Sequence, residues 1–266
     1  MKIALNGKIV EVADARIDPA DRGLAFGDGL FETMSLRKGR VRRLPAHLAR
    51  LRLGAGALGI PLAYDDANLE SQVTGLVAAN TLTEAVVKIT LTRGPDARGL
   101  ALPARPKPTL LITTAEAPPE PEPARVIISS VTRRNEFSAL SRFKTLNYLD
   151  NVIARDQAVQ AGADDALLLN TQGRLAGGTA ANVFLLVNGG LITPPVEEGA
   201  LPGVARADAI RLTRAEEKPV TVETLIDASE VFLTNALGVR AVVRIGDKPV
   251  GDGEPGLITQ LVATRV

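Results

Sequence analysis

The chain has 266 residues, of which 45% are hydrophobic and 23% charged, so it is long enough to bury one large core or two smaller ones. Its net charge is +1 and only 3% of its residues are aromatic. Nucleic acid is therefore not an expected partner, because such binding needs a basic surface and stacking aromatics. With no cysteine and one histidine, His47, the composition excludes a disulfide scaffold, a cysteine nucleophile and a His-rich metal site. We expect no metal.

The N-terminal residues and the apolar runs bear on location. No apolar run approaches the roughly 20 residues that a membrane-spanning helix needs. The first five residues lead into Asn6-Gly7, which is too early a turn for a signal peptide. We therefore expect a cytoplasmic protein with no membrane partner.

Residues 1–116 predict a small α+β domain. Asn6-Gly7 supplies the two positive φ angles of a type I′ turn, so the flanking residues are expected to form a β-hairpin. Apolar spacing then predicts two helices followed by two strands, at 44–58, 69–77, 85–92 and 108–113.

Residues 117–124 predict a linker, because the four prolines within this segment cannot lie inside a helix or a central strand. The remaining residues, 125–266, predict a second domain with one long helix and several strands. The helix is expected at 146–160, and the strands at 126–130, 166–169, 182–187, 220–222 and 231–234, before a last hairpin near 246–247. Hairpins in both halves and few βαβ alternations favour a two-domain α+β fold over a doubly wound sheet.

Lysine is scarce, which draws attention to Lys144. Eight of the 31 basic residues are Lys, and Lys144 follows Phe143 just before the long predicted helix. A lysine amine held among apolar neighbours can serve as a nucleophile. A solvated loop lysine is the plain alternative.

Five motifs carry a resemblance to a known family. They lie at 26–33, 46–51, 144–149, 169–173 and 182–184. In this order and spacing they resemble the class IV aminotransferases, the fold type IV enzymes that use pyridoxal 5′-phosphate (PLP). That family includes D-amino-acid and branched-chain aminotransferases and aminodeoxychorismate lyase. The resemblance implies a smaller N-terminal α+β domain, a larger β-rich pseudo-barrel domain that binds PLP, and a homodimer.

The resemblance assigns roles to three side chains around the cofactor. Lys144 matches the lysine that bonds covalently to PLP and then moves protons at the substrate Cα, and a nucleophilic amine is what this chemistry requires. Arg50 matches the arginine that binds the cofactor phosphate, for which a planar guanidinium is suited. Tyr148 is expected to reach the phenolic oxygen of PLP. A solvated helix arginine and a core tyrosine are the alternatives for Arg50 and Tyr148.

Two backbone turns are also expected to bind the phosphate. A helix begins near Gly203, and its first N–H groups can bind phosphate oxygens, although an ordinary helix start has the same sequence. The second turn follows a predicted strand. The residues assigned to these turns are Gly203, Val204 and Ala205, and Thr234, Asn235 and Ala236.

The loop 93–99 resembles the family's substrate-carboxylate loop, with Arg98 as the expected anion-binding residue and Arg93 as either a second one or a structural residue. Phe31 is expected to line the substrate pocket, where relatives have Tyr, Phe or another pocket residue, and it offers no polar contact to the substrate carboxylate. D-amino-acid aminotransferases have His two residues beyond the arginine, whereas this chain has Leu100. Both differences weigh against a D-amino-acid substrate.

Gly177 is the main departure from the family. Five residues before Asn182 the family has a glutamate that pairs with the pyridine nitrogen of PLP, and this chain has Gly177. Without a carboxylate there, the ring nitrogen tends to be neutral and loss of the Cα proton is less favoured. Lyase or racemase-like chemistry, or loss of activity, gains weight.

The leading hypothesis is a PLP-dependent aminotransferase that transfers an amino group between an amino acid and a 2-oxo acid. The alternative is aminodeoxychorismate lyase, which forms 4-aminobenzoate and pyruvate in the folate pathway. Tyr148 favours the aminotransferase, because many lyases have Arg there. A third hypothesis, prompted by Gly177, is a catalytically impaired relative that binds a small ligand.

Overall fold

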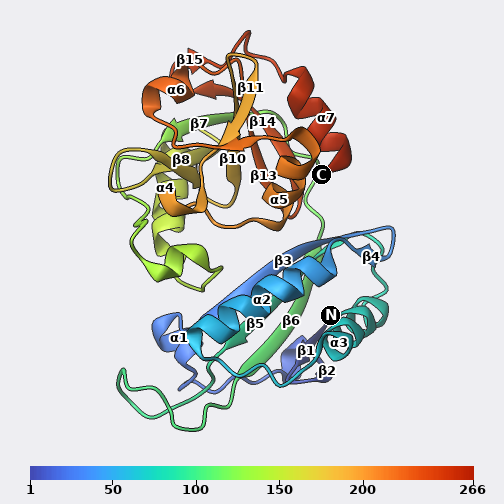
Figure 1. Ribbon diagram of the computed structural model, residues 1–266. Helices are drawn as coiled ribbons and strands as arrows, with labels where there is room; N and C mark the ends of the chain where they lie inside the picture. Colours follow the sequence, from blue (N-terminus) through green and yellow to red (C-terminus); the bar gives the residue numbers. More distant parts are fainter. The chain divides into compact units, whose positions relative to one another are not determined.

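The computed structural model describes all 266 residues, and the chain separates into two compact units (Figure 1). Unit 1 comprises residues 1–118 and 144–147, and unit 2 comprises 119–143 and 148–266. The expected linker, 117–124, spans the first boundary, and its last residue already begins a strand. Residues 144–147, expected within the C-terminal domain, pack with unit 1 because their backbone pairs with a strand of that unit.

Unit 1 is built on a six-stranded antiparallel sheet of order β2-β1-β6-β5-β3-β4. Its strands are β1 (Lys2–Leu5), β2 (Lys8–Glu11), β3 (Gly29–Arg37), β4 (Arg40–Val41), β5 (Ala85–Thr92) and β6 (Thr109–Glu116). The first hairpin is confirmed, with φ of 50° at Asn6 and 82° at Gly7, the positive angles that a type I′ turn requires.

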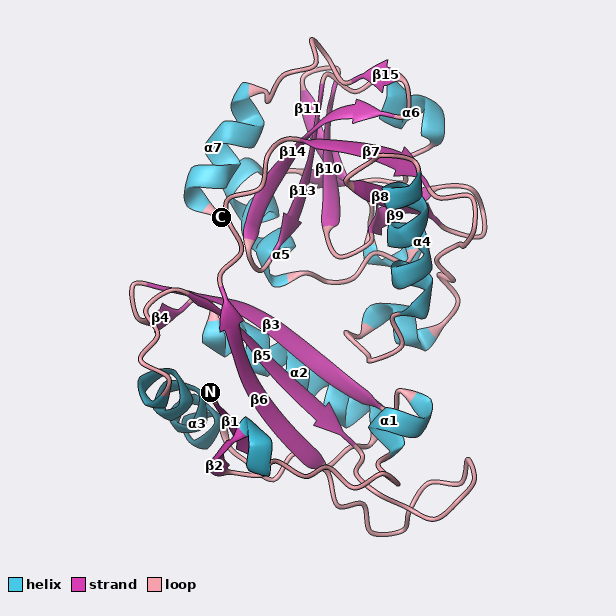
Figure 2. Cartoon of the chain, turned by 180° about the vertical axis from the view of Figure 1, so that it is seen from behind, coloured by secondary structure: helices cyan, strands magenta, loops and turns pink.

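Helices cover one face of this sheet (Figure 2). Unit 1 contains η1 (Val12–Asp14), α1 (Arg22–Phe26), α2 (Leu44–Leu58) and α3 (Asp66–Ala79). Helix α2 packs on β3, and α3 packs on β1 and β6. Leu51 and Leu69 on these helices and Met34 and Ile89 on the strands are all buried. Because side chains alternate along a strand, the residues between the buried ones, Phe31 among them, lie on the opposite face of the sheet.

Unit 2 has a nine-stranded sheet of order β12-β11-β10-β13-β14-β7-β8-β9, with β15 paired to β14. The sheet is curled, so that β9 at its end also contacts β10. The strands are β7 (Ala124–Ile128), β8 (Asp165–Leu169), β9 (Leu175–Gly178), β10 (Asn182–Val187), β11 (Gly190–Thr193), β12 (Glu216–Glu217), β13 (Glu230–Asn235), β14 (Gly238–Ile245) and β15 (Lys248–Pro249). This curled sheet confirms the expected α+β fold with a β-rich second part.

The helices of unit 2 pack against different strands of the curled sheet. They are η2 (Ala139–Arg142), α4 (Leu149–Gln160), η3 (Val196–Glu198), α5 (Val204–Thr213), α6 (Val222–Ile226) and α7 (Leu257–Arg265). Helix α4 packs on β8, while α5 and α7 pack on β13. Under them the rings of Phe184 and Phe232 stack with centroids 5.0 Å apart, an offset aromatic contact that adds to area burial. No helix in either unit is both long enough and apolar enough to span a bilayer.

The strand expected at 220–222 is wrong. Thr221 is the N-cap of α6, and its side chain accepts a hydrogen bond from the Thr224 backbone N–H at 3.2 Å. Val220 is buried and its carbonyl accepts from the Leu175 N–H at 2.8 Å. The short Val-Thr-Val run has the composition of a strand, but threonine before a helical turn is a strong cap, and the cap prevails here.

Candidate active site

Lys144 lies beside β3, held there by its own backbone. Its carbonyl accepts a hydrogen bond from the Phe31 N–H at 2.9 Å, and two residues on the Leu146 N–H donates to the Gly29 carbonyl at 3.0 Å. Leu30 and Thr145 form an antiparallel bridge between these bonds. The Lys144 Nζ is 4.2 Å from the centroid of the Phe31 ring. The structure therefore brings together two of the residues that the sequence predicted for the site.

Lys88 also contacts the Phe31 ring, and sequence analysis did not single it out. Its Nζ lies 4.8 Å from the ring centroid, because Lys88 on β5 is opposite Thr33 on β3. Cations are attracted to the face of an aromatic ring. The signal was present in the sequence, since Lys88 is the one charged residue in an otherwise uncharged strand.

Arg50 forms a buried ion pair with Glu32. Its Nε donates to Glu32 Oε1 at 2.8 Å and its Nη2 donates to Glu32 Oε2 at 2.7 Å. The Nδ1 of His47, one turn earlier on α2, is 2.7 Å from the same Oε2. Only 1% of Glu32 and 2% of His47 are exposed. This two-bond geometry fixes the plane of the guanidinium, and the phosphate role of Arg50 stays a prediction.

The only sequence signal for Glu32 and His47 is their spacing from neighbouring residues on the strand and on the helix. Glu32 shares the helix-facing side of β3 with Leu30 and Met34, while His47 and Arg50 are three residues apart on α2 and thus lie on one face. Burial alone raises the pKa of Glu32, but the hydrogen bonds from Arg50 and His47 outweigh it, and the pKa lies below its ordinary value. Glu32 is therefore expected to stay ionised at neutral pH.

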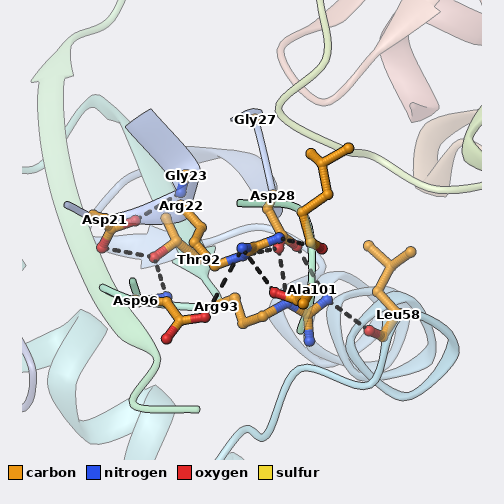
Figure 3. A network of polar contacts seen from close by, with 12 residues as sticks. Asp21, Arg22, Gly23, Gly27, Asp28, Leu58, Thr92, Arg93, Asp96 and Ala101 are labelled. Carbon is orange, nitrogen blue, oxygen red and sulfur yellow. Dashed lines mark hydrogen bonds and ion pairs between the residues drawn. The ribbon is translucent and has the colours of Figure 1, made fainter. Parts of the chain in front are cut away.

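Arg93 is bound within the protein, which favours the structural alternative given for it. Its Nε and Nη2 donate to the two carboxylate oxygens of Asp28, at 2.8 and 3.1 Å, and its Nη1 donates to the Gly59 carbonyl at 2.9 Å (Figure 3). Arg93 is 4% exposed. Arg98, five residues on, is exposed and takes part in no ion pair. Of the two, Arg98 is the residue available to an anionic substrate.

The two predicted phosphate-binding turns of unit 2 are linked by Asn182. This residue is opposite Thr234 in the pairing of β10 with β13, and its Nδ2 donates to the Leu201 carbonyl at 2.8 Å, just before α5. Gly203 is the N-cap residue of α5, and no side chain at this position accepts a hydrogen bond from the first N–H groups of the helix. A Cβ on Gly203 would overlap the Asn182 side chain, so only glycine permits this approach. Sequence analysis used Asn182 only as a motif residue and missed this role.

Thr234 shows that the place suits an anion. Its Oγ1 is buried and has no hydrogen-bond partner, an arrangement that costs free energy unless a ligand supplies an acceptor. The first N–H groups of α5 have no partner within the helix, and the helix dipole favours negative charge at that end. The Oδ1 of Asn235 accepts a hydrogen bond from the Leu237 N–H at 2.8 Å. This bond closes the turn after Thr234, and Ala236 lies within that turn. These residues fit the phosphate of PLP.

Gly177 and Tyr148 both belong to unit 2. Gly177 lies on β9 opposite Leu168, outside the left-handed φ region, and a Cβ there would contact only the Ala181 carbonyl, at 3.0 Å. The carboxylate of Asp165 lies beside the next residue, but it accepts from the Thr179 hydroxyl and is 3.4 Å from Arg155 Nη1. Tyr148 is the half-buried N-cap residue of α4. The cofactor contacts expected of Gly177 and Tyr148 stay predictions.

The comparisons with known proteins define the family. The sequence model of the family Amino-transferase class IV matches residues 29–245, which include both the Lys144 segment and the turns around Thr234. The chain therefore belongs to the class IV aminotransferases, a family of PLP-dependent transaminases and lyases.

Individual relatives fall into more than one activity. The chain is 35% identical over 268 residues to a Methanocaldococcus jannaschii protein provisionally named a branched-chain-amino-acid aminotransferase, covering 98% of this chain and 93% of that one. It is 31% identical over 272 residues to D-alanine aminotransferase from Bacillus licheniformis, covering 100% and 96%. The solved structure of 4-amino-4-deoxychorismate lyase from Pseudomonas aeruginosa superposes with a TM-score of 0.87 at 32% identity, covering 99% and 97%.

Replacing Glu32 by Gln should destabilise the protein and reduce its sensitivity to acid. The loss of one partner from a buried ion pair costs about 3–5 kcal/mol. Because the folded-state pKa of Glu32 is lowered, its contribution is present above the unfolded pKa of about 4.3 and is lost as pH falls through the folded value.

Urea unfolding of wild type and Glu32→Gln at neutral pH and at lower pH measures both effects. The matched control is Glu84→Gln, since Glu84 forms an exposed pair with Arg37 at 3.5 Å and should change stability by less than about 1 kcal/mol. Equal acid sensitivity of wild type and Glu32→Gln would contradict the assignment.

Proposed function

We propose that the protein is an aminotransferase that transfers an amino group between an amino acid and a 2-oxo acid with PLP as cofactor. The observation that carries the proposal is the placement of Lys144, whose amine lies 4.2 Å from the Phe31 ring centroid in a segment fixed to β3 by two backbone hydrogen bonds. A lysine fixed in this way supports the covalent role that the family resemblance assigns to it.

Each proposed role follows from the chemistry of the residue. PLP, when bound, supplies an electron-withdrawing ring that stabilises negative charge at the substrate Cα. Lys144 holds the cofactor covalently and then moves the proton at Cα. In unit 2, Thr234 Oγ1 and the first N–H groups of α5 donate to the phosphate. For Arg50, which Glu32 orients, the phosphate role is the one that the family resemblance assigns. Arg98 binds the substrate carboxylate. Homodimer assembly and a cytoplasmic location stay predictions.

Aminodeoxychorismate lyase remains the second candidate, and one specific observation favours it. The solved Pseudomonas aeruginosa lyase is 32% identical to this chain over nearly its whole length. Tyr148 supports the aminotransferase instead, as argued from the family resemblance. Product assays separate the two candidates, since transfer converts an added 2-oxo acid to an amino acid, whereas the lyase releases 4-aminobenzoate and pyruvate from aminodeoxychorismate.

Lys144→Ala should abolish the covalent link to PLP. Wild type with PLP should show a visible absorbance band that borohydride abolishes, and the reduced cofactor should stay attached to the peptide that contains residue 144. Lys8→Ala, at an exposed position on β2, is the control and should keep the band. A reducible band in Lys144→Ala would overturn the assignment, and its absence from wild type would favour the ligand-binding alternative.

Thr234→Val should weaken PLP binding without loss of stability, because the hydroxyl it removes has no partner within the protein. We expect roughly a tenfold higher Kd, equivalent to about 1.4 kcal/mol. Thr193→Val is the matched control, since Thr193 is equally buried but donates to the Val183 carbonyl at 2.7 Å. The control should lose stability and keep its PLP affinity. An unchanged Kd in Thr234→Val removes Thr234 from the phosphate site.

Gly177→Glu should fold if the Ala181 carbonyl, 3.0 Å from an added Cβ, moves by a few tenths of an ångström, because the position does not need a left-handed φ. A carboxylate there should hold a proton at the pyridine nitrogen and so accelerate removal of the Cα proton. Single-turnover rates with several amino donors, measured beside the melting temperature, test this. A folded, PLP-loaded variant with no faster half-reaction would show that protonation of the ring does not limit the enzyme.

A further inference from the structure

Arg22 binds a loop that lies far from it in the sequence. It is the first residue of α1 and is 4% exposed. Its Nη1 donates to the carbonyls of Gly99 and Ala101, at 3.0 and 3.2 Å, and its Nη2 donates to the carbonyl of Leu100 at 3.4 Å. One guanidinium therefore engages three consecutive carbonyls in the segment that directly follows Arg98.

Backbone hydrogen bonds attach the start of the loop to this side, from the Arg22 N–H to the Gly94 carbonyl at 3.0 Å and from the Asp96 N–H to the Ala20 carbonyl at 3.3 Å, but none of them reaches residues 97–101. Residues 97–100 are all exposed, with Leu100 79% and Leu102 63% exposed, so the loop buries almost no apolar area there. A cavity of about 250 Å³ lies between α1 and the loop, with Arg22 and Arg98 both in its wall. Apolar packing therefore does not fix residues 99–101, and their carbonyls are held by the Arg22 guanidinium.

Arg22 is itself held firmly. Its Nε donates to Asp28 Oδ2 at 2.8 Å, and the same carboxylate binds Arg93 (Figure 3). Burial raises the pKa of Asp28, but the hydrogen bonds from Arg93 and Arg22 outweigh it, and the net shift is downward. At the start of α1, Asp21 accepts from the hydroxyls of Thr92 and Thr109 at 2.9 and 2.6 Å, which fixes α1 to the two strands that the loop connects.

We propose that Arg22 is a positioning residue for substrate binding, because it sets the conformation of residues 99–101 and thereby the place of the Arg98 guanidinium. The inference rests on the proposed role of Arg98 as the group that binds the substrate carboxylate. Arg22 does not touch the substrate. A guanidinium is needed at this position, since the ammonium of a lysine does not have the planar set of donors that bonds three carbonyls while also binding Asp28.

Four variants test the proposal in the PLP-loaded enzyme: Arg22→Ala, Arg22→Lys, Arg98→Ala and the double variant Arg22→Ala with Arg98→Ala. Arg22→Ala should raise KM for the amino acid on the order of tenfold and change kcat far less, because the binding group is misplaced while the reacting groups are not. Arg22→Lys keeps the ion pair with Asp28 and folds if Arg22→Ala does not, and it should show the same rise.

The double variant separates positioning from general stability. If Arg22 acts through Arg98, Arg22→Ala should raise KM no further in the Arg98→Ala background. Additive effects on KM, or a fall in kcat with KM unchanged, would overturn the proposal. Arg37→Ala is the matched control, because Arg37 is an exposed arginine of the same unit, 3.5 Å from Glu84, and it should leave both constants unchanged.

Hydrogen exchange gives a readout that needs no catalysis. The amide of Asp96, which donates to the Ala20 carbonyl at 3.3 Å, should exchange faster in Arg22→Lys and Arg22→Ala than in wild type, and at the wild-type rate in Arg98→Ala. Unchanged exchange in both Arg22 variants would show that Arg22 does not hold the loop and would overturn the proposal. If products show elimination instead of transfer, the proposed function fails, and the same KM comparison on the elimination reaction still decides the role of Arg22.

Discussion

The place of Lys144 depends on a short backbone pairing between residues 144–146 and the start of β3. The hydrogen bond from the Phe31 N–H to the Lys144 carbonyl, at 2.9 Å, and that from the Leu146 N–H to the Gly29 carbonyl, at 3.0 Å, extend the sheet of unit 1 by a few residues taken from the middle of the chain. Backbone pairing of this kind is insensitive to side-chain identity but fixes side-chain direction. A lysine amine and an aromatic ring thereby meet across two segments that are more than 100 residues apart.

The elements that could be predicted from the sequence are those that depend only on residues close together in the chain. Short-range patterns predicted several of them. Apolar spacing predicted helix α2 and the strands β5 and β10, and the Asn-Gly turn predicted the first hairpin. The Glu32, His47 and Arg50 cluster could not be derived in the same way, because a bond between a strand and a helix depends on which faces pack together. Likewise, the role of Asn182 depends on the register that sets it opposite Thr234, and register follows from the assembled sheet.

The strand wrongly expected at 220–222 and the placement of 144–147 in unit 1 have one cause. Composition within three or four residues does not determine what a segment pairs with, and tertiary contacts decide between close alternatives. Thr221 caps a helix because the residues after it, Val222–Ile226, form α6. Residues 144–147 join unit 1 because one edge of β3 is unpaired at its start and bonds to their backbone. By contrast, the family motifs assigned Phe31 and Lys144 to one site through their order along the chain, and the structure brings these two side chains together.

Three arginines of unit 1 are bound to carboxylates within the protein. Arg22, Arg93 and Arg50 are each bound to a carboxylate, Asp28 for the first two and Glu32 for the third, and buried arginines of this kind need such partners. Arg98 and Lys88 form no ion pair, although Lys88 contacts the Phe31 ring beside Lys144. The internal pairs hold the loop and helix in place, whereas the binding of a substrate carboxylate by Arg98 stays a proposal.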